Sequence, residues 1–300
     1  MTLLAFRERF LSEVAKTAMP GGRTLGFYTY CYDALLRFPP LANCALGDIN
    51  EDLIARYQDY ALLPTHLRPV GRATLNRRMA TLRKALGLAM SWSLISKIPA
   101  VKILKGERER EFVFSRETLA EWLQRAPEPL RSFTILAVEC GMCLSEMIQL
   151  TWDDIELFPI QDKYGFYGFL KVRKGKTKFR RRTLPITAMM KEVFERQRCS
   201  RTTGIVFVRS NGGAVLPQTV SQQARRLRNR LGLPWDACLH AARHTALTNF
   251  GTSGVDPFTL QLIAGHSNIT TTKRYVHPSL INIQNAFSMR SDNLFRTKPE

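Results

Sequence analysis

Apolar residues recur at helical spacing through the first hundred residues, interrupted by breaks rich in proline and glycine. The pattern predicts a domain made of helices, at residues 4–15, 24–37, 51–62 and 73–94. The next stretch contains the alternating run Lys-Gly-Glu-Arg-Glu-Arg-Glu and keeps no apolar period. We therefore predict a helical N-terminal domain over residues 1–98 and a linker over residues 99–112.

The rest of the chain, residues 113–300, mixes two periods. A helix is expected to begin after Ser115, because serine is a good N-cap residue whose hydroxyl accepts a hydrogen bond from the first turn. Between residues 164 and 186 the apolar period shortens to two, which predicts two antiparallel strands joined by a turn at Gly175. The expected fold is mainly α with a small antiparallel β-sheet: a helical N-terminal domain followed by an α+β domain.

Charge separates this chain from an average globular protein. It contains 44 Lys and Arg residues against 25 Asp and Glu residues, a formal net charge of +19. Such an excess repels itself in a folded protein and is typical of a chain that binds a polyanion such as nucleic acid. On the helix predicted at residues 73–94, Arg77 and Lys84 lie opposite the apolar face. That basic face fits a solvated surface and a contact with a DNA backbone equally well.

The N-terminus and the cysteines bear on the compartment. Charged residues such as Arg7 and Glu8 stand where a signal peptide would need an apolar run, and no apolar stretch approaches the length of a membrane span. We therefore expect a cytoplasmic protein without a membrane segment, with its six cysteines reduced. Cys140 and Cys143 have CxxC spacing, but no second Cys or His pair lies near them, so they give little support to zinc or redox chemistry.

Four of the five histidines lie within one segment of 38 residues, together with an arginine and a tyrosine. In chain order the motif reads His240-Ala-Ala-Arg243-His244, then Gly265-His266, then Tyr275. His240 and His244 have the spacing of a metal-binding pair on a helix. The arginine between them, however, disfavours a dication and favours a phosphate.

In this order and spacing, the motif resembles the signature of the tyrosine recombinases, the phage integrase family. Residues 140–155 are similar to the family's first catalytic box, and the basic run at residues 174–178, leading to Leu184-Pro185, resembles its lysine-bearing turn. The resemblance covers residues 112–294 and extends loosely to the helical N-terminal region, where the family has its core-binding domain. It implies a nucleoid-associated, site-specific DNA recombinase that acts on double-stranded DNA as a tetramer on two duplexes, with no metal and no other cofactor.

The resemblance implies chemical roles that fit the residue types. Tyr275 would attack the phosphodiester and form a 3′-phosphotyrosyl intermediate with a free 5′-hydroxyl. Arg243 would place its guanidinium fork on the non-bridging oxygens, which gain negative charge in the transition state. His240 would accept the tyrosine proton or bind the phosphate, and His266 would donate to the same phosphate. His244 ranks below His240, because it can also pack behind Arg243.

The predicted turn between the two strands is crowded with cations. Residues 171–182 contain eight Lys and Arg side chains and no acidic one. Lys176 comes just after Gly175, and this place in the turn favours it as the general acid that protonates the leaving oxygen. Lys174 and Lys178 are alternatives. The other cations are expected to contact the phosphate backbone and to set the affinity and its salt dependence. The predicted DNA-contacting residues are Arg77, Lys84, Lys174, Lys178, Arg180, Arg181, Arg225 and Arg228.

Cys143 departs from the family pattern, which has an arginine two residues after the glycine of the first box. A thiol cannot make the bidentate contact, and losing one transition-state donor costs on the order of a hundredfold to a thousandfold in rate. Glu146, on the same helical face, is expected to lose the cation with which it would pair. Three interpretations follow: another cation replaces the arginine, the enzyme is slow but adequate, or the protein only binds DNA. An enzyme similar to type IB topoisomerases is a further alternative.

The segment after Tyr275 contains one more apolar stripe, on a helix predicted at residues 279–295. Its members are Leu280, Ile283, Phe287 and Leu294. The stripe can pack on its own domain. In the family an element at this place commonly docks on a neighbouring protomer, so the resemblance implies a role in assembly.

Overall fold

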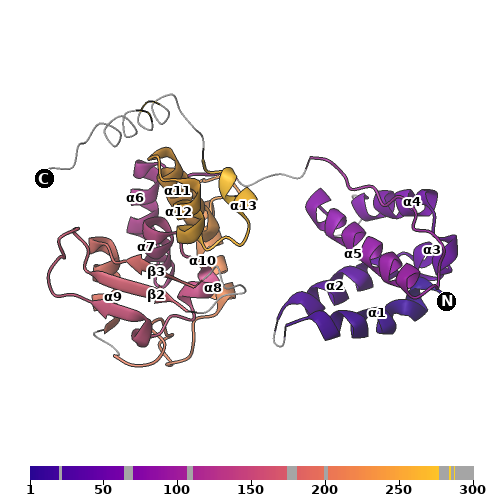
Figure 1. Ribbon diagram of the computed structural model, residues 1–300, viewed down its shortest axis with the longest axis horizontal. Helices are drawn as coiled ribbons and strands as arrows, with labels where there is room; N and C mark the ends of the chain where they lie inside the picture. The colour runs from indigo at the N-terminus through magenta and orange to yellow at the C-terminus, as the bar shows by residue number, and fades with distance from the viewer. Residues whose placement is uncertain are drawn as a thin grey trace, which may run out of the picture. The chain divides into compact units, whose positions relative to one another are not determined.

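The chain divides into two units, Met1–Glu109 and Arg110–Glu300, in the computed structural model of the protein (Figure 1). The structure describes residues 1–19, 22–63, 70–106, 111–173, 181–198 and 202–276, together with Gln284 and Phe287. The first unit is helical, and the second combines helices with a three-stranded antiparallel sheet. The predicted fold class is thereby confirmed.

The first unit contains the four helices that the apolar periods predicted, with ends that differ by up to three residues, and two short helical segments besides. Its elements are α1 (Leu3–Thr17), α2 (Thr24–Leu36), α3 (Pro39–Ala42), η1 (Leu46–Asp48), α4 (Glu51–Leu62) and α5 (Arg72–Ser91). The sequence pattern does not predict α3, because the pair Pro39-Pro40 is typical of a break between helices; proline is, however, also well suited to a first helical turn. The side chains of Thr2 and Asn50 cap α1 and α4 by accepting backbone N–H bonds.

Helix α5 supplies much of the core of the first unit. Leu75, Met79, Leu82 and Leu86 are fully buried, while Arg77 and Lys84 are exposed on the other side of the helix, as its amphipathic pattern predicted. Nζ of Lys84 lies 4.6 Å from the ring centroid of Tyr28. Val101 and Leu104, from the stretch predicted as linker, also pack on this core. The boundaries proposed for the domains stay a prediction.

The second unit is organised around one buried helix, α7. The helical elements are α6 (Arg116–Arg125), α7 (Leu130–Cys140), α8 (Leu144–Met147), η2 (Trp152–Asp154), α9 (Ala188–Arg198), α10 (Pro217–Arg230), α11 (Leu239–Thr252), α12 (Pro257–Ala264) and α13 (Ile269–Lys273). Helix α7 packs against both α11 and α9, and Phe133 and Leu136 on it are fully buried. Ser115 accepts a hydrogen bond from the N–H of Thr118, which confirms the predicted N-cap of α6.

The sheet of this unit has the order β1-β2-β3, all antiparallel. Its strands are β1 (Ile155–Leu157), β2 (Gly168–Val172) and β3 (Arg182–Pro185). The two predicted strands are confirmed as β2 and β3, whereas β1 is too short for an alternating pattern to reveal it. Leu170 pairs with Leu184 and Val172 with Arg182, so Arg182 stands on the inward face of the sheet beside Leu184. The predicted turn at Gly175 lies outside the described residues.

Candidate active site

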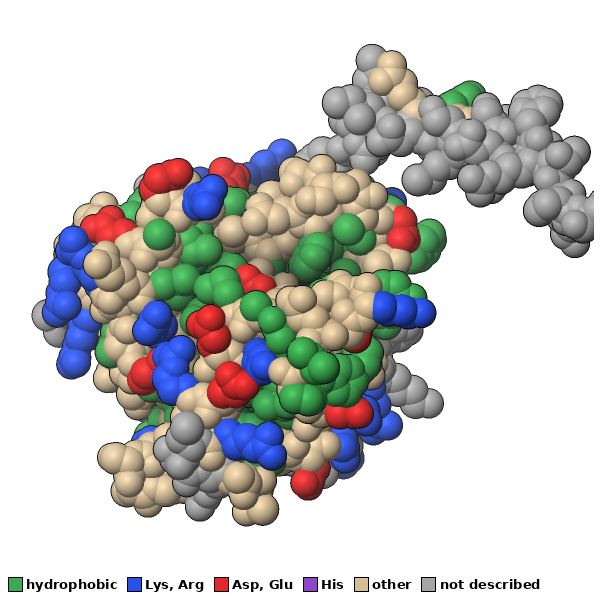
Figure 2. Space-filling view, turned by 90° about the vertical axis from the view of Figure 1, so that its left-hand side faces the viewer, with side chains coloured by type: hydrophobic (Ala, Val, Ile, Leu, Met, Phe, Trp, Pro, Cys, Tyr) green, Lys and Arg blue, Asp and Glu red, His purple; other side chains and the backbone are tan. Residues whose placement is uncertain are grey.

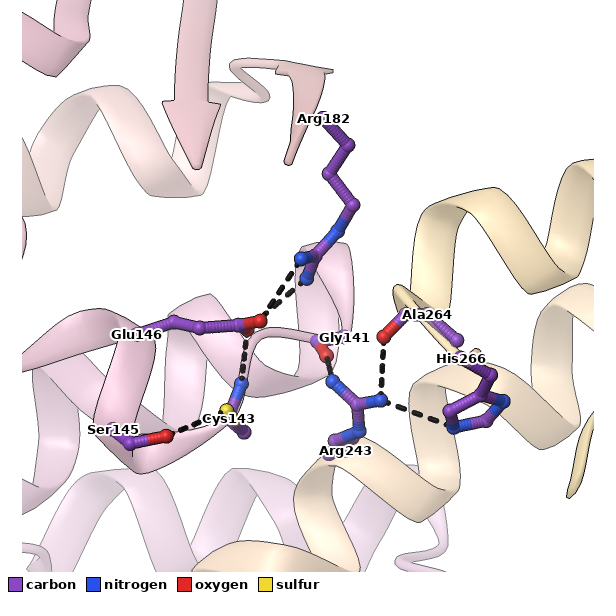
Figure 3. A network of polar contacts seen from close by, with 8 residues as sticks. All are labelled: Gly141, Cys143, Ser145, Glu146, Arg182, Arg243, Ala264 and His266. Atoms are coloured by element: carbon purple, nitrogen blue, oxygen red, sulfur yellow. Dashed lines mark hydrogen bonds and ion pairs between the residues drawn. The ribbon is translucent and has the colours of Figure 1, made fainter. Parts of the chain in front are cut away.

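Arg243 lies in the interior of the second unit, where it links two helix ends (Figure 3). Its Nη1 donates to the carbonyl of Gly141 at 2.5 Å, and its Nη2 donates to the carbonyl of Ala264 at 2.6 Å. Gly141 caps α7 and Ala264 is the last residue of α12, so the cation meets the negative ends of two helix dipoles. Burial lowers the pKa of Arg243, but a guanidinium remains protonated in proteins. These carbonyls explain how the chain holds a charge that is only 7% exposed.

His266 joins Arg243 to the segment that carries the tyrosine. The left-handed conformation of Gly265 ends α12 and turns the chain toward the guanidinium. Nε2 of His266 lies 3.1 Å from Nη2 of Arg243, and its Nδ1 lies 3.0 Å from Oγ1 of Thr272. Because a guanidinium only donates, Nε2 must accept, which places the imidazole proton on Nδ1. Arg243 therefore fixes the tautomer of His266, and the hydroxyl oxygen of Thr272, which is fully buried, accepts the Nδ1 proton.

Tyr275 lies next to this histidine and is only 6% exposed. Its ring is nearly parallel to that of His266, with centroids 6.2 Å apart, and is tilted against His244 at 5.2 Å. Burial raises the pKa of the Tyr275 phenol, against the opposing charges of Arg274 and Arg243. The structure thus brings Arg243, His266 and Tyr275 together, although they lie on separate elements or loops of this segment.

The sequence predicts His244 as a weaker candidate than His240, one that can pack behind Arg243. The structure instead places its ring against Tyr275, where burial, helped by the charge of Arg274, lowers the pKa of His244. His240 is exposed and lines a cavity of about 300 Å³ beside Arg243 and Cys143. Helices α8, α10 and α11 form the walls of this cavity. The roles of both histidines stay predictions.

The expectation that Glu146 lacks a cation is wrong. Arg182 donates to it from β3 through two hydrogen bonds, Nη1 to Oε1 at 2.9 Å and Nη2 to Oε2 at 3.1 Å (Figure 3). The Arg182 and Glu146 side chains are 1% and 2% exposed. Oε2 also accepts the backbone N–H of Cys143 at 3.0 Å, which holds the first turn of α8. Glu146 is therefore paired with an arginine, Arg182, although residue 143 is a cysteine.

The charge state of Glu146 follows from these contacts. Burial would raise its pKa, but the hydrogen bonds and charge of Arg182, the Cys143 N–H and the charge of Arg243 together hold the pKa below its ordinary value. The burial of Arg182 could have been predicted from the sequence, although it is only one of eight cations in this stretch. Leu184 is apolar and faces inward, and in a strand every second side chain lies on the same face, so Arg182 shares that buried face.

Several predicted DNA contacts can be located in the structure. Arg181 and Arg225 are exposed, whereas Arg228 is half-buried and donates to the carbonyl of Trp235 at 2.5 Å. A hollow beside β2 and β3 is lined by four cations: Lys171, Arg173, Arg181 and Arg182. The residues predicted for the turn, Lys174, Lys176, Lys178 and Arg180, lie outside the described residues. So do Leu280, Ile283 and Leu294 of the C-terminal stripe, while Phe287 is exposed.

The described part of the chain also bears on metal binding and on the state of the cysteines. Within it, no three His, Cys, Asp or Glu side chains are arranged to hold a metal ion. Cys31, Cys44, Cys140, Cys143 and Cys238 are thiols rather than disulfides. No helix of the described ranges is long and apolar enough to cross a membrane.

Comparison with known proteins gives consistent matches over nearly the whole length. The profile of the "Phage integrase family" matches residues 115–280, and that of the "Phage integrase SAM-like domain" matches residues 2–103. Tyrosine recombinase XerC of Bacillus subtilis is 24% identical over 263 residues, which are 81% of this chain and 83% of the relative. The Tn1549 transposon integrase in complex with a circular intermediate DNA superposes with a TM-score of 0.76 at 17% identity, covering 96% of this chain and 99% of that one. A lambda integrase tetramer bound to a Holliday junction gives 0.73 at 19% identity, covering 92% and 78%.

Proposed function

Because this chain belongs to the phage integrase family of tyrosine recombinases, we propose that it cleaves and rejoins duplex DNA at specific sites through a covalent link at Tyr275. The observation that carries the proposal is the contact chain from Arg243 through His266 to Tyr275. A phosphate-binding cation and a nucleophile need to share one phosphorus atom. Both side chains contact the same imidazole here, so one phosphodiester can reach both.

The chemistry is a transesterification. Oη of Tyr275 attacks the phosphorus, the bond from phosphorus to the 5′ oxygen breaks, and the 3′ phosphate stays on the tyrosine. The phenol is protonated at neutral pH, since burial raises its pKa, so its proton has to pass to a base such as His240. The leaving 5′ oxygen takes a proton from a lysine, for which we propose Lys176. Ligation is the same step in reverse, and the energy of the diester is retained in the covalent link.

Arg243 can bind the phosphate without giving up its structural contacts. A guanidinium carries five N–H donors. Its hydrogen bonds to Gly141, Ala264 and His266 use one N–H of Nη1 and both N–H groups of Nη2 among the described residues, which leaves the Nε–H and one N–H of Nη1 for the non-bridging oxygens. The helix ends orient the guanidinium in advance, so little reorganisation is needed when the charge develops.

We further propose that the enzyme is attenuated by Cys143. The Glu146–Arg182 pair keeps the first box folded and neutralises its carboxylate, but the Arg182 side chain is only 1% exposed and points both Nη atoms at Glu146. Arg182 therefore stabilises the site without serving as a second fork on the phosphate. With Arg243 as the only assigned fork, cleavage is expected to be slower by about a hundredfold or more than with two.

We propose double-stranded DNA as the partner, bound on a side of the second unit other than the one shown in Figure 2. On that face acidic and basic side chains are interspersed, and no described histidine is visible. A phosphate backbone is bound by a surface of one sign. The exposed Arg181 and Arg225, and Arg77 and Lys84 on the first unit, are the proposed backbone contacts.

We propose a tetramer on two duplexes as the working assembly. The lambda integrase, of the same fold, is known as a tetramer on a Holliday junction. In this chain the residues after Tyr275 carry the apolar stripe of Leu280, Ile283, Phe287 and Leu294, and Phe287 is 65% exposed. Such a stripe suits docking on a second copy of the chain.

Covalent trapping on nicked DNA tests the proposed activity. The chain is incubated with a library of nicked duplexes, adducts are isolated under denaturing conditions, and the attached DNA is sequenced. A recombinase gives adducts at one sequence, and a topoisomerase-like enzyme gives them at many. Chelation of divalent metals should leave the yield unchanged, because the proposed chemistry uses none. A strict metal requirement would instead favour metal binding by His240 and His244.

A second candidate function is DNA binding without cleavage, which the cysteine at position 143 favours. A family member that had lost its chemistry would bind DNA tightly and give no adduct on any nicked duplex. The buried Arg243 does not distinguish the two functions, because it also has a structural role between two helix ends. The trapping experiment separates them directly.

A further inference from the structure

Gly251 occupies a place in α11 where a glycine needs an explanation. It is buried one residue before the end of this helix. A glycine within a helix costs up to about 1 kcal/mol relative to alanine, because it loses more backbone freedom on folding. Its backbone does not adopt the left-handed conformation that favours glycine. The reason must therefore be space.

The space is taken by the backbone of the nucleophile. A Cβ atom on Gly251 would lie 1.8 Å from the carbonyl oxygen of Tyr275, 2.8 Å from its carbonyl carbon and 3.5 Å from its Cβ. The two nearest are backbone atoms, which cannot swing aside as the end of a long side chain can. The N–H of Tyr275 is meanwhile tied to the carbonyl of Thr272 at 2.9 Å, and Thr272 is bonded to His266.

We propose that Gly251 is a positioning residue for Tyr275. By lacking a side chain, it lets the tyrosine segment dock directly on α11 of the same chain, and so sets the position of the phenol relative to His266 and Arg243. This inference rests on the proposed function, in which Tyr275 is the nucleophile. Relieving the overlap would move the Tyr275 carbonyl by roughly 1 Å, and a misplacement of that size can cost on the order of a hundredfold in rate.

The test compares Gly251→Ala with a matched glycine that has room. Gly87, in α5, has no atom within 4 Å of the place where its Cβ would lie. We expect Gly251→Ala to lower the rate of adduct formation on a nicked duplex by about a hundredfold, with DNA affinity within about threefold. Gly87→Ala should change neither.

A spectroscopic readout separates positioning from loss of structure. The chain has eight tyrosines, and labelling with 3-fluorotyrosine gives each a fluorine resonance. The Tyr275→Phe variant assigns the resonance of interest. In Gly251→Ala we expect that resonance to shift while the other seven stay in place. A general change of all resonances, with a collapse of the melting temperature, would overturn the proposal in favour of a structural role.

The remaining outcomes are also decisive. An unmoved Tyr275 resonance, or an adduct rate close to that of the unmodified chain, would show that Gly251 does not position the tyrosine. If the unmodified chain forms no adduct on any duplex, the proposed function fails. In that case the fluorine spectrum still reports whether Gly251 sets the place of Tyr275.

Discussion

Replacing Arg182 with methionine should destabilise the second unit strongly. Methionine retains much of the length of the side chain but removes the charge and both hydrogen bonds to Glu146. The carboxylate is 2% exposed, so it cannot recover its solvation from water. Breaking a buried pair from one side costs about 3 to 5 kcal/mol. For a unit of this size, that corresponds to a fall in melting temperature of roughly 6 to 20 °C.

The pH dependence of this effect has a defined sign. In the unmodified chain the pKa of Glu146 is below its ordinary value, so its contribution to stability is present above about pH 4.3 and is lost as the pH falls through the lower folded pKa. Without Arg182, burial dominates and raises the pKa of the carboxyl group. As the pH falls, protonation of Glu146 removes the buried, unpaired charge from the variant. The difference in melting temperature between the variant and the unmodified chain should therefore be largest at neutral pH and should shrink toward about pH 5.

Calorimetry of the full chain measures the effect, with two control variants. Arg181→Met removes an exposed cation next to Arg182 and should change the melting temperature by no more than about 2 °C. The double variant Glu146→Leu with Arg182→Met replaces both charges by apolar groups and should recover much of the loss. Two results would contradict this inference. Either Arg182→Met would have the same melting temperature as the unmodified chain, or the double variant would have a melting temperature no higher than that of Arg182→Met.

Three further variants test other parts of the account. Cys143→Arg should add a second fork beside Arg243 and raise cleavage by about tenfold or more, a barrier change of about 1.4 kcal/mol; an unchanged or lower rate would show that the site has no use for it. Arg225→Ala should weaken DNA binding equally for all sequences and reduce the slope of log affinity against log salt by about one, so an unaltered slope would remove Arg225 from the interface. Truncation before Leu280 should leave binding to a single site intact and abolish synaptic complexes on native gels. Normal assembly by the truncated chain would contradict the docking role.

The long elements and the order of the chemical motifs could be predicted from the sequence. Helices such as α4 and α5 have a full apolar face, and that period appears in the residues themselves. Arg243 and Tyr275 are predicted as site residues because their order and spacing resemble the motif of the family. A strand of three residues such as β1 leaves no period to detect, and Pro39-Pro40 fits a break as well as a helix start.

The partners of the site residues could not be predicted in the same way. Glu146 and Arg182 are 36 residues apart and meet only because the fold brings the start of β3 next to α8. A pattern along the chain gives the face on which Arg182 lies but not the carboxylate across from it. The space at Gly251 is likewise a property of how Tyr275 docks on α11, since nothing in the local sequence demands a glycine there.

The most direct test of the central claim is adduct formation by the Tyr275→Phe variant on a nicked duplex. The substitution removes only the phenol oxygen from a ring that packs against His244 and His266. We predict that the variant binds the same DNA with an affinity within a few-fold and gives no adduct that survives denaturation, whereas the unmodified chain gives one. A denaturant-stable adduct of the phenylalanine variant would show that Tyr275 is not the nucleophile.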